Sequence, residues 1–368
     1  MPLFRGHPDL ARRLPHAALG EFPTPVDRLA GAGDAIGAGR LYIKRDDLSG
    51  SLYGGNKVRK LEFLLADALR AGAREVMTVG FAGSNHALAT AIYAGQLGLK
   101  SVSMLMPQPN AHYVRRNLLA SHHYGAELHH FRDTAHLSLG VAGRSLQGMT
   151  RRLGPPRFIP AGGSCPLGVV GYVNAAFELR DQVMAGDLPE PHAIYVPLGS
   201  MGTAVGLALG LKAAGLGSRV VAVRVIEERW APRRHMARLL HQTVAFLRDL
   251  APAFPRVDIT ETALAVRDDC MGDGYACFTE DGVKATELMR RGAGITLNGA
   301  YSAKAFAALL ADARQPGLED KTILFWNTYN SRDLSAVASR VDYHQLPTAF
   351  HRYFEEDVQP LDRAGLDR

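Results

Sequence analysis

The chain has 368 residues, of which 47% are hydrophobic, and a formal net charge of +6. That length can bury two separate cores, and the sequence lacks an uncharged run of the roughly 18 apolar residues that a membrane helix needs. Its basic residues are not interleaved with aromatic side chains in a block, so no nucleic-acid partner is predicted. Three cysteines are too few and too scattered for a disulfide framework, which favours a cytoplasmic location.

The first part of the chain alternates predicted strands and helices. A short strand over 41–44 precedes a tight Gly-Gly turn, and Asn56 is expected to cap a helix over 57–69, which keeps one apolar face. Further strands are expected over 75–79, 101–106 and 128–131, and further helices over 87–97, 111–121 and 137–152. This alternation predicts βαβ units and a parallel sheet.

Pro155 and Pro156 mark a break, after which the alternation resumes in a predicted second lobe. The expected elements are strands over 193–197, 220–225 and 322–326, helices over 167–184, 234–250, 281–291 and 302–311, and a helix ending at Ala214. The stretch 251–273 has no readable pattern. The tail beyond Asp342 is expected to be peripheral or to face a partner.

Two stretches are candidate anion sites. The first turn of the 57–69 helix carries Lys57, Arg59 and Lys60, where each cation opposes the helix dipole by roughly 0.3–1 kcal/mol. A bound phosphate would offset that cost, although a solvated basic face that simply tolerates it is the alternative.

The second stretch is the loop of Gly199, Ser200, Met201, Gly202 and Thr203, between a strand and a helix. Small residues let backbone N–H groups converge on a phosphate there. An ordinary tight turn is the alternative for this loop.

The strings KRDD and GGNKVRKLE, at 44–47 and 54–62, resemble pyridoxal-phosphate (PLP) enzymes of the D-cysteine desulfhydrase and 1-aminocyclopropane-1-carboxylate (ACC) deaminase family. The resemblance runs from about Leu19 to Leu334. It implies an α/β protein with the two-lobed PLP fold type II, like tryptophan synthase β, with parallel-rich twisted sheets flanked by helices. We expect a small α/β domain over 50–165, and a large PLP-binding domain formed by 1–49 and 166–368.

The same resemblance assigns cofactor roles. Lys57 would form the Schiff base with PLP, and Lys60 would help to hold the phosphate. The loop Gly199–Thr203 would cradle the phosphate, and Met201 there replaces a small residue of the family pattern while keeping its backbone donor.

Ser84, Asn85 and His86 lie at a strand-to-helix junction, where Ser and Asn are also favoured as helix caps. By resemblance, Asn85 would hydrogen-bond the ring hydroxyl of PLP, and this segment would bind the substrate carboxylate. Gly83 stands where the family often has Gln, which is expected to widen the carboxylate side.

Tyr275 and Tyr301 match two active-site tyrosines of the family. Either could relay a proton if its surroundings lower its pKa. The alternative is a tyrosine that is merely packed by its ring.

Ser302 and Thr328 match two positions near the pyridine nitrogen. ACC deaminases carry Glu and Leu there, whereas desulfhydrases carry hydroxyl residues. A hydroxyl cannot hold a proton on the ring nitrogen as a carboxylate can. The sequence therefore predicts α,β-elimination from D-cysteine or a β-substituted D-alanine, giving a keto acid and ammonia, without useful ACC deamination. A β-replacement enzyme, a racemase and a non-catalytic binding protein are the alternatives.

Two departures from the family pattern affect the substrate. Tyr329 and Asn330 replace a glycine pair and are expected to crowd or cap the ring edge, and Cys165 stands where Asn is common. Cys165 is interpreted as a small buried hydrophobe, with a reactive thiol as the alternative. The resemblance implies a homodimer that acts on a small amino acid.

Overall fold

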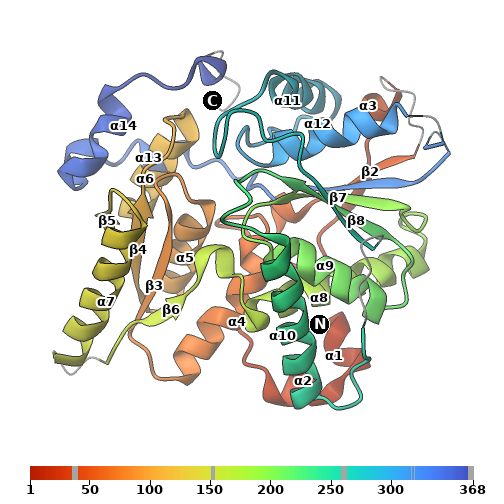
Figure 1. Cartoon of the computed structure of the whole chain (residues 1–368), viewed down its shortest axis with the longest axis horizontal. Coiled ribbons are helices and arrows are strands. Elements are labelled where there is room, and N and C mark those ends of the chain that lie inside the picture. The colour runs from red at the N-terminus through yellow and green to blue at the C-terminus, as the bar shows by residue number, and fades with distance from the viewer. Residues whose placement is uncertain (35–39, 151–153, 258–262, 316, 319, 364–368) are drawn as a thin grey trace.

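The computed structural model describes residues 1–34, 40–150, 154–257, 263–315, 317–318 and 320–363. Two β-sheets form two lobes that lie side by side, with helices packed around each sheet (Figure 1). Within the described ranges, no helix is long and apolar enough to cross a bilayer.

The smaller sheet has four parallel strands in the order β5-β4-β3-β6. They are β3 (Glu75–Phe81), β4 (Lys100–Met106), β5 (Glu127–His130) and β6 (Arg157–Ile159). Neighbouring side chains of β3 point to opposite faces, so Val76 packs with helices α4 (Lys57–Arg70) and α5 (Asn85–Gln96), whereas Met77 packs toward α7 (Thr134–Thr150). Both faces of the sheet are thereby covered, as is usual for parallel strands.

The larger sheet has six strands in the order β1-β2-β10-β7-β8-β9, and only the β1–β2 pair is antiparallel. They are β1 (Val26–Arg28), β2 (Leu41–Lys44), β7 (Ala193–Leu198), β8 (Arg219–Arg224), β9 (Leu264–Arg267) and β10 (Ile323–Trp326). In β7, Ile194 and Val196 face one helical layer, and Ala193 and Tyr195 face the other.

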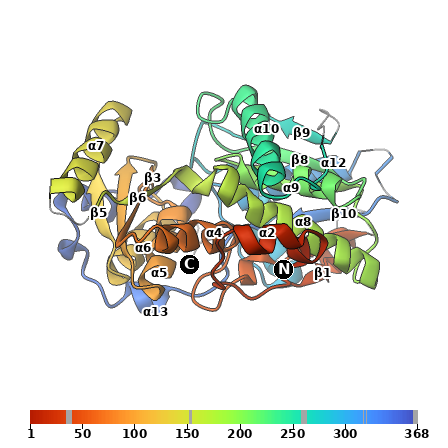
Figure 2. The ribbon, with the colours of Figure 1, turned by 90° about the horizontal axis from the view of Figure 1, so that it is seen from below.

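The large lobe has two helical layers on opposite sides of its sheet (Figure 1), and Figure 2 looks onto one of them from below. One layer contains α1 (Pro2–Gly6), α2 (Pro8–Arg13), α8 (Pro166–Ala185), α9 (Gly202–Ala213) and α10 (Arg233–Leu250). The other contains α3 (Ala30–Asp34), α11 (Glu280–Ala293) and α12 (Ser302–Ala313). The long α8 starts with Pro166 and stops at Gly186, whose φ of 84° is a glycine C-cap conformation.

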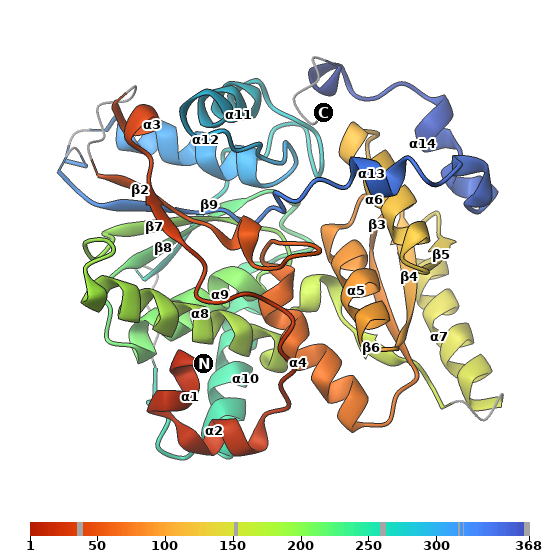
Figure 3. The same cartoon turned by 180° about the vertical axis from the view of Figure 1, so that it is seen from behind.

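The C-terminal segment returns to the smaller lobe, where α13 (Ser335–Ala338) and α14 (Arg352–Glu355) lie near α6 (His112–His123) (Figure 3). Phe350 and Tyr353 are buried in one apolar cluster with Tyr113 of α6. The backbone oxygen of Tyr353 accepts a hydrogen bond from Arg115 Nε at 2.6 Å. The tail was expected to be peripheral or to face a partner; within its described part, Phe350 and Tyr353 are buried in this cluster.

Most elements lie where the alternation of the sequence predicts them. Among the described residues, sequence reasoning missed eight short α-helices and strands, because three to six residues carry too little periodicity to be read: α1, α2, β1, α3, β6, β9, α13 and α14. Residues 151 and 152 of the predicted 137–152 helix, and residues 258–262 of the unreadable stretch, lie outside the described residues. The domain division at 50 and 165 stays a prediction.

Candidate active site

The turn before α4 is built on two glycines that admit no side chain. A Cβ on Gly54 would clash with the backbone oxygen of Asp47, and Gly55 has a φ of 95°, which favours glycine. The next residue, Asn56, donates its backbone N–H to the oxygen of Thr328 at 3.1 Å. The start of α4 is therefore fixed against the end of β10.

Asn56 is the N-cap residue of α4, as predicted, but its side chain makes no cap hydrogen bond. Its amide nitrogen instead donates to Thr203 Oγ1 at 3.0 Å, and its amide oxygen accepts from Lys57 Nζ at 2.7 Å. Asn56 thus connects the lysine to the first turn of α9.

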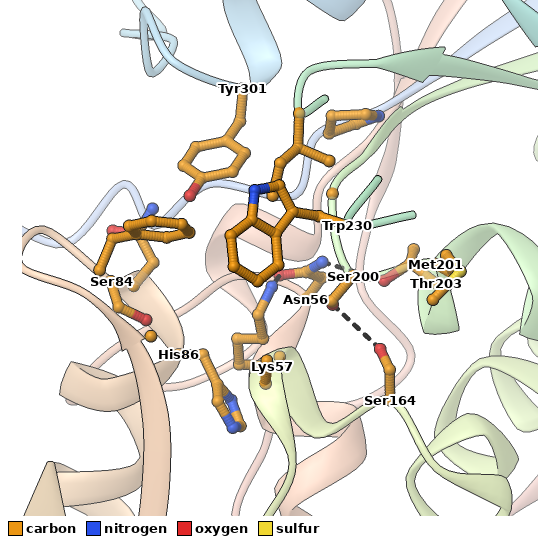
Figure 4. A pocket seen from close by; sticks show the side chains of 18 of the residues that line it. Asn56, Lys57, Ser84, His86, Ser164, Ser200, Met201, Thr203, Trp230 and Tyr301 are labelled. Atoms are coloured by element: carbon orange, nitrogen blue, oxygen red, sulfur yellow. Dashed lines mark hydrogen bonds between the residues drawn. The ribbon is translucent and has the colours of Figure 1, made fainter. Parts of the chain in front are cut away.

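The Lys57 side chain lines a cavity of about 360 Å³ between the two lobes. Figure 4 shows this lysine among Ser84, His86, Ser200 and Thr203, which come from both lobes. Burial lowers the pKa of Lys57 to about 8, because a charged amine is poorly solvated there. A lysine amine with this pKa is partly neutral near pH 7 and can act as a nucleophile or a base.

Of the three cations at the start of α4, Arg59 is not available to an anion. Its guanidinium lies in a buried network, 2.7 Å from Asp46 Oδ1 and 2.9 Å from Glu178 Oε1. Lys44 donates to the same Glu178 oxygen at 2.6 Å. Burial alone would raise the pKa of Glu178, but Arg59 and Lys44 outweigh that effect and lower it to about 2.

Lys60 lies beside the predicted phosphate loop, and its amine donates to the backbone oxygen of Gly162 at 3.0 Å. Burial, with Lys57 nearby, lowers the pKa of Lys60 well below its usual value. A Cβ on Gly202 would come within 2.9 Å of this amine and 2.6 Å of Ser164 Oγ. The glycine therefore keeps open a recess lined by an amine and a hydroxyl.

The conformation of the Gly199–Thr203 loop suits a phosphate. Met201 has a φ of 71°, so it holds the left-handed backbone that glycine ordinarily adopts. Gly202 then begins α9, whose N-terminal amides and dipole favour an anion. A Cβ on Gly162 would clash with Ser200 across the recess. The residues present fit a phosphate group.

A second helix N-terminus, that of α5, opens into the same cavity. Ser84 Oγ accepts from the N–H of Ala87 at 3.1 Å, so Ser84 does cap this helix. The amide oxygen of Asn85 accepts from Asn117 at 2.8 Å and from Tyr53 at 3.2 Å. Because its oxygen is occupied in this way, Asn85 is left with its NH₂ group as a donor for a ring hydroxyl.

The expected widening at Gly83 does not occur. A Cβ there would lie 2.8 Å from the side chains of Tyr113 and Val114, and 3.0 Å from that of Gln108. Gln108 also accepts the Gly83 N–H at 2.8 Å. These three side chains fill the space that a larger residue would use.

Tyr275 and Tyr301 both line the cavity, and their hydroxyls form a short hydrogen bond with each other. Burial raises the pKa of Tyr301 to about 12 and that of Tyr275 well above its usual value. From the sequence, either tyrosine was expected to relay a proton only if its pKa were lowered. Both pKa values are raised instead, so the two hydroxyls keep their protons at neutral pH and can donate hydrogen bonds.

The two hydroxyl residues expected near the pyridine ring differ in position. Thr328 lines the cavity, whereas the fully buried Ser302 uses its hydroxyl to accept the N–H of Asn298 at 2.7 Å and is not part of the cavity wall. The role of Ser302 toward a cofactor stays a prediction.

The structure also shows where the residues that depart from the family pattern lie. Tyr329 lines the cavity, but Asn330 accepts the N–H of Gly54 at 2.7 Å and thus supports the turn before α4 rather than a ring edge. Cys165 packs beside an apolar cluster, and burial raises the pKa of its thiol. Its environment is that of a small hydrophobe.

Sequence reasoning missed the large apolar side chains of the cavity wall. The residues that carry them belong to no motif and come from four separate segments: Phe81, Met106, Leu137, Ile226 and Trp230. In the sequence, only the rarity of tryptophan could have drawn attention to Trp230, because the chain has two tryptophans.

Several known proteins are similar to this chain over most of its length. A family model described as pyridoxal-phosphate dependent enzyme matches residues 17–328. Nocardicin C-9' epimerase of Nocardia uniformis subsp. tsuyamanensis is 33% identical over 88% of this chain and 95% of its own. D-cysteine desulfhydrase of Klebsiella pneumoniae subsp. pneumoniae is 34% identical over 86% and 94%. A crystal structure of an ACC deaminase homologue superposes with a TM-score of 0.74 at 30% identity, covering 89% of this chain and 94% of that one. The chain belongs to the family of pyridoxal-phosphate dependent enzymes.

Proposed function

We propose that the protein is a lyase of the D-cysteine desulfhydrase type. It would remove the Cα proton and a β leaving group from an amino acid, giving a keto acid and ammonia. Support comes from the curated relative named D-cysteine desulfhydrase and from Thr328, a hydroxyl residue, in the cavity wall. The observation that carries the proposal is the Lys57 amine in a cavity between two helix N-termini.

Bound PLP supplies an electron sink for the negative charge that develops at Cα. Lys57 would hold it covalently, with Lys60 and the Gly199–Thr203 loop at its phosphate and Asn85 at its ring hydroxyl. Once released, the neutral Lys57 amine would take the proton from Cα, and its pKa of about 8 suits a base at neutral pH.

The α5 N-terminus would orient the substrate carboxylate through Ser84, Asn85 and His86. Both ring nitrogens of the buried His86 lack a side-chain hydrogen-bond partner, and burial lowers its pKa well below the usual value. It would therefore meet the substrate as a neutral ring. Tyr301, paired with Tyr275, would donate a hydrogen bond to the departing group.

The test is keto-acid release from D-cysteine, L-cysteine, β-chloro-D-alanine and ACC. We expect turnover of the thiol or chloro substrates in at least one configuration, and little from ACC. Turnover of ACC that equals or exceeds the others would contradict the proposal, and so would a lack of turnover of all four.

Substitution Gly202→Asp should weaken PLP binding by more than tenfold, which corresponds to about 1.4 kcal/mol. The new side chain would enter the recess beside Lys60 and Ser164 and place a negative charge against the phosphate. Equilibrium dialysis of PLP measures the change. Gly143→Asp is the matched control, because nothing lies within 4 Å of a Cβ there. Unchanged affinity in a folded Gly202→Asp protein would exclude this loop.

The rate of PLP incorporation into apoprotein should depend on pH through Lys57. Burial lowers its pKa, so the reactive neutral amine increases about tenfold between pH 6 and pH 7 and levels off above about pH 8. Stopped-flow absorbance measures the rate. A rate that keeps rising through pH 10, as for free lysine, would show that Lys57 is not desolvated.

Epimerisation is a second candidate, because one relative of similar identity is named an epimerase. An epimerase would exchange the Cα proton with solvent and release no keto acid. Incubation of D- and L-amino acids in D₂O with chiral analysis separates the two reactions.

We also propose, from the family resemblance, that the enzyme is a cytoplasmic homodimer with a small domain over 50–165 and a large domain formed by 1–49 and 166–368. All three cysteines are free, in line with a reducing compartment. Light scattering after size exclusion tests the dimer.

A further inference from the structure

Four aromatic rings contact one another in series along the wall of the cavity. Trp230 contacts Phe81 edge-on with ring centroids 6.0 Å apart, and Phe81 lies 4.4 Å from Tyr275. Tyr275 in turn contacts Tyr301 at 5.9 Å. We call these four residues the aromatic wall. All four line the same cavity as Lys57, and Figure 4 shows Trp230 and Tyr301 there beside that lysine.

The aromatic wall borders the place where an amino-acid substrate must lie. Phe81 ends β3 only three residues before Ser84, the cap of α5. An amino acid whose carboxylate is bound at that cap would therefore lie close to Phe81, which contacts Tyr275. The phosphate recess is formed by other residues: Lys60, Ser164 and Gly202.

The aromatic wall offers more apolar surface than the side chain of cysteine could contact. Trp230 is 36% exposed and lines the cavity, and Met106 and Leu137 extend the apolar lining. Exposed apolar side chains that converge in a cavity indicate a site for an apolar ligand. The –CH₂SH group of cysteine would cover little of this surface.

We infer that the substrate carries a bulky apolar group beyond Cβ, with an aromatic ring as the best fit to the aromatic wall. This inference rests on the proposed elimination and names its substrate class: S-aryl or S-aralkyl conjugates of cysteine. An aromatic leaving group would offset-stack or pack edge-on against Phe81 and Trp230, the geometries that aromatic pairs prefer.

The reaction balances without an oxidant or reductant. For S-phenyl-D-cysteine, the Cα–H bond breaks and its proton goes to Lys57. The Cβ–S bond then breaks, and sulfur leaves with the electron pair as thiophenolate. One water molecule hydrolyses the remaining enamine, so the products are thiophenol, pyruvate and ammonia.

The experiment compares kcat/KM of the holoenzyme for S-phenylcysteine and cysteine, in both configurations, by pyruvate release. We expect the phenyl substrate to be preferred at least tenfold, since even one methylene in an apolar pocket changes specificity 10–200-fold. Trp230→Ala and Phe81→Ala should each lower this preference at least fivefold. Trp230→Phe, which keeps a ring, should restore most of it.

Phe158→Ala is the matched control, because Phe158 is an aromatic residue that is 47% exposed on β6 and does not line the cavity. It should leave the preference unchanged. Thermal unfolding of each variant shows whether the fold is retained. A preference for cysteine itself, or one that Trp230→Ala does not change, would overturn the inference while leaving the proposed elimination intact.

If S-phenylcysteine, cysteine and the other substrates tested above all yield no pyruvate, the proposed function fails and binding decides the inference separately. Calorimetry then compares 3-phenylpropanoate with propanoate on the holoenzyme. Binding of the phenyl acid at least tenfold more tightly, and lost in Trp230→Ala, supports the aromatic wall as a ligand site. Equal binding of the two acids contradicts it.

Discussion

Substitution Lys57→Ala should lower keto-acid release by at least about 100-fold, the usual minimum contribution of a general base. The loss follows because this residue is expected both to hold the cofactor and to move the Cα proton. Its amine is the one from α4 that lines the cavity, since Arg59 is bound to carboxylates and Lys60 faces the backbone of Gly162. Steady-state kinetics on the substrate that the wild-type protein uses best measure the effect.

Lys100→Ala is the control for this variant, because Lys100 is an exposed lysine at the start of β4, away from the cavity wall. It should retain wild-type turnover. Added methylamine, which can supply a small free base, should restore part of the activity of Lys57→Ala. Turnover within threefold of wild type in Lys57→Ala would refute the role of this residue.

Substitution Glu178→Ala should lower the free energy of unfolding by about 3–5 kcal/mol, the usual effect of breaking a buried ion pair. It would leave Lys44 and Arg59 buried together with Asp46 as the remaining acid of the network. Urea unfolding followed by circular dichroism measures the change. Glu287→Ala, which removes an exposed partner of Arg290, should have little effect.

The same network predicts how stability depends on pH. The pKa of Glu178 in the folded protein, about 2, lies below its ordinary value of 4.5. Its stabilising contribution is therefore complete above about pH 5 and is lost as the pH falls toward 2. The stability difference between wild type and Glu178→Gln should shrink over that range. A difference that is constant from pH 6 to pH 3 would contradict the assigned ion pairs.

The parts of the site that the sequence predicted are local. Gly54, Gly55 and Lys57 are consecutive or nearly so, and their turn is set by backbone sterics that a short motif records. The Gly199–Thr203 loop is likewise fixed by its own chain between β7 and α9. Ser84 was predicted both as a cap and as a site residue, and the structure places it at the start of α5 and in the cavity wall.

The parts that the sequence did not predict depend on distant partners. Arg59 was grouped with the anion-binding cations, because nothing near it signals its pairing with Glu178, 119 residues later. Asn56 was correctly predicted at the N-cap of α4, but the bond of its side chain to Thr203 was not predicted, because it exists only once the two lobes meet. Trp230 lies in a short connection after β8, where no periodicity points to a cavity.

The central claim, that Lys57 holds the cofactor, is tested most directly by reducing the holoenzyme with borohydride and mapping the modified peptide by mass spectrometry. Reduction makes the bond between the lysine nitrogen and the pyridoxyl group permanent, so the label survives digestion. The account predicts the pyridoxyl mass on Lys57 and bleaching of the yellow absorbance band in equal proportion. A label on Lys44, Lys60 or Lys304 instead, or a protein that takes up no PLP, would contradict it.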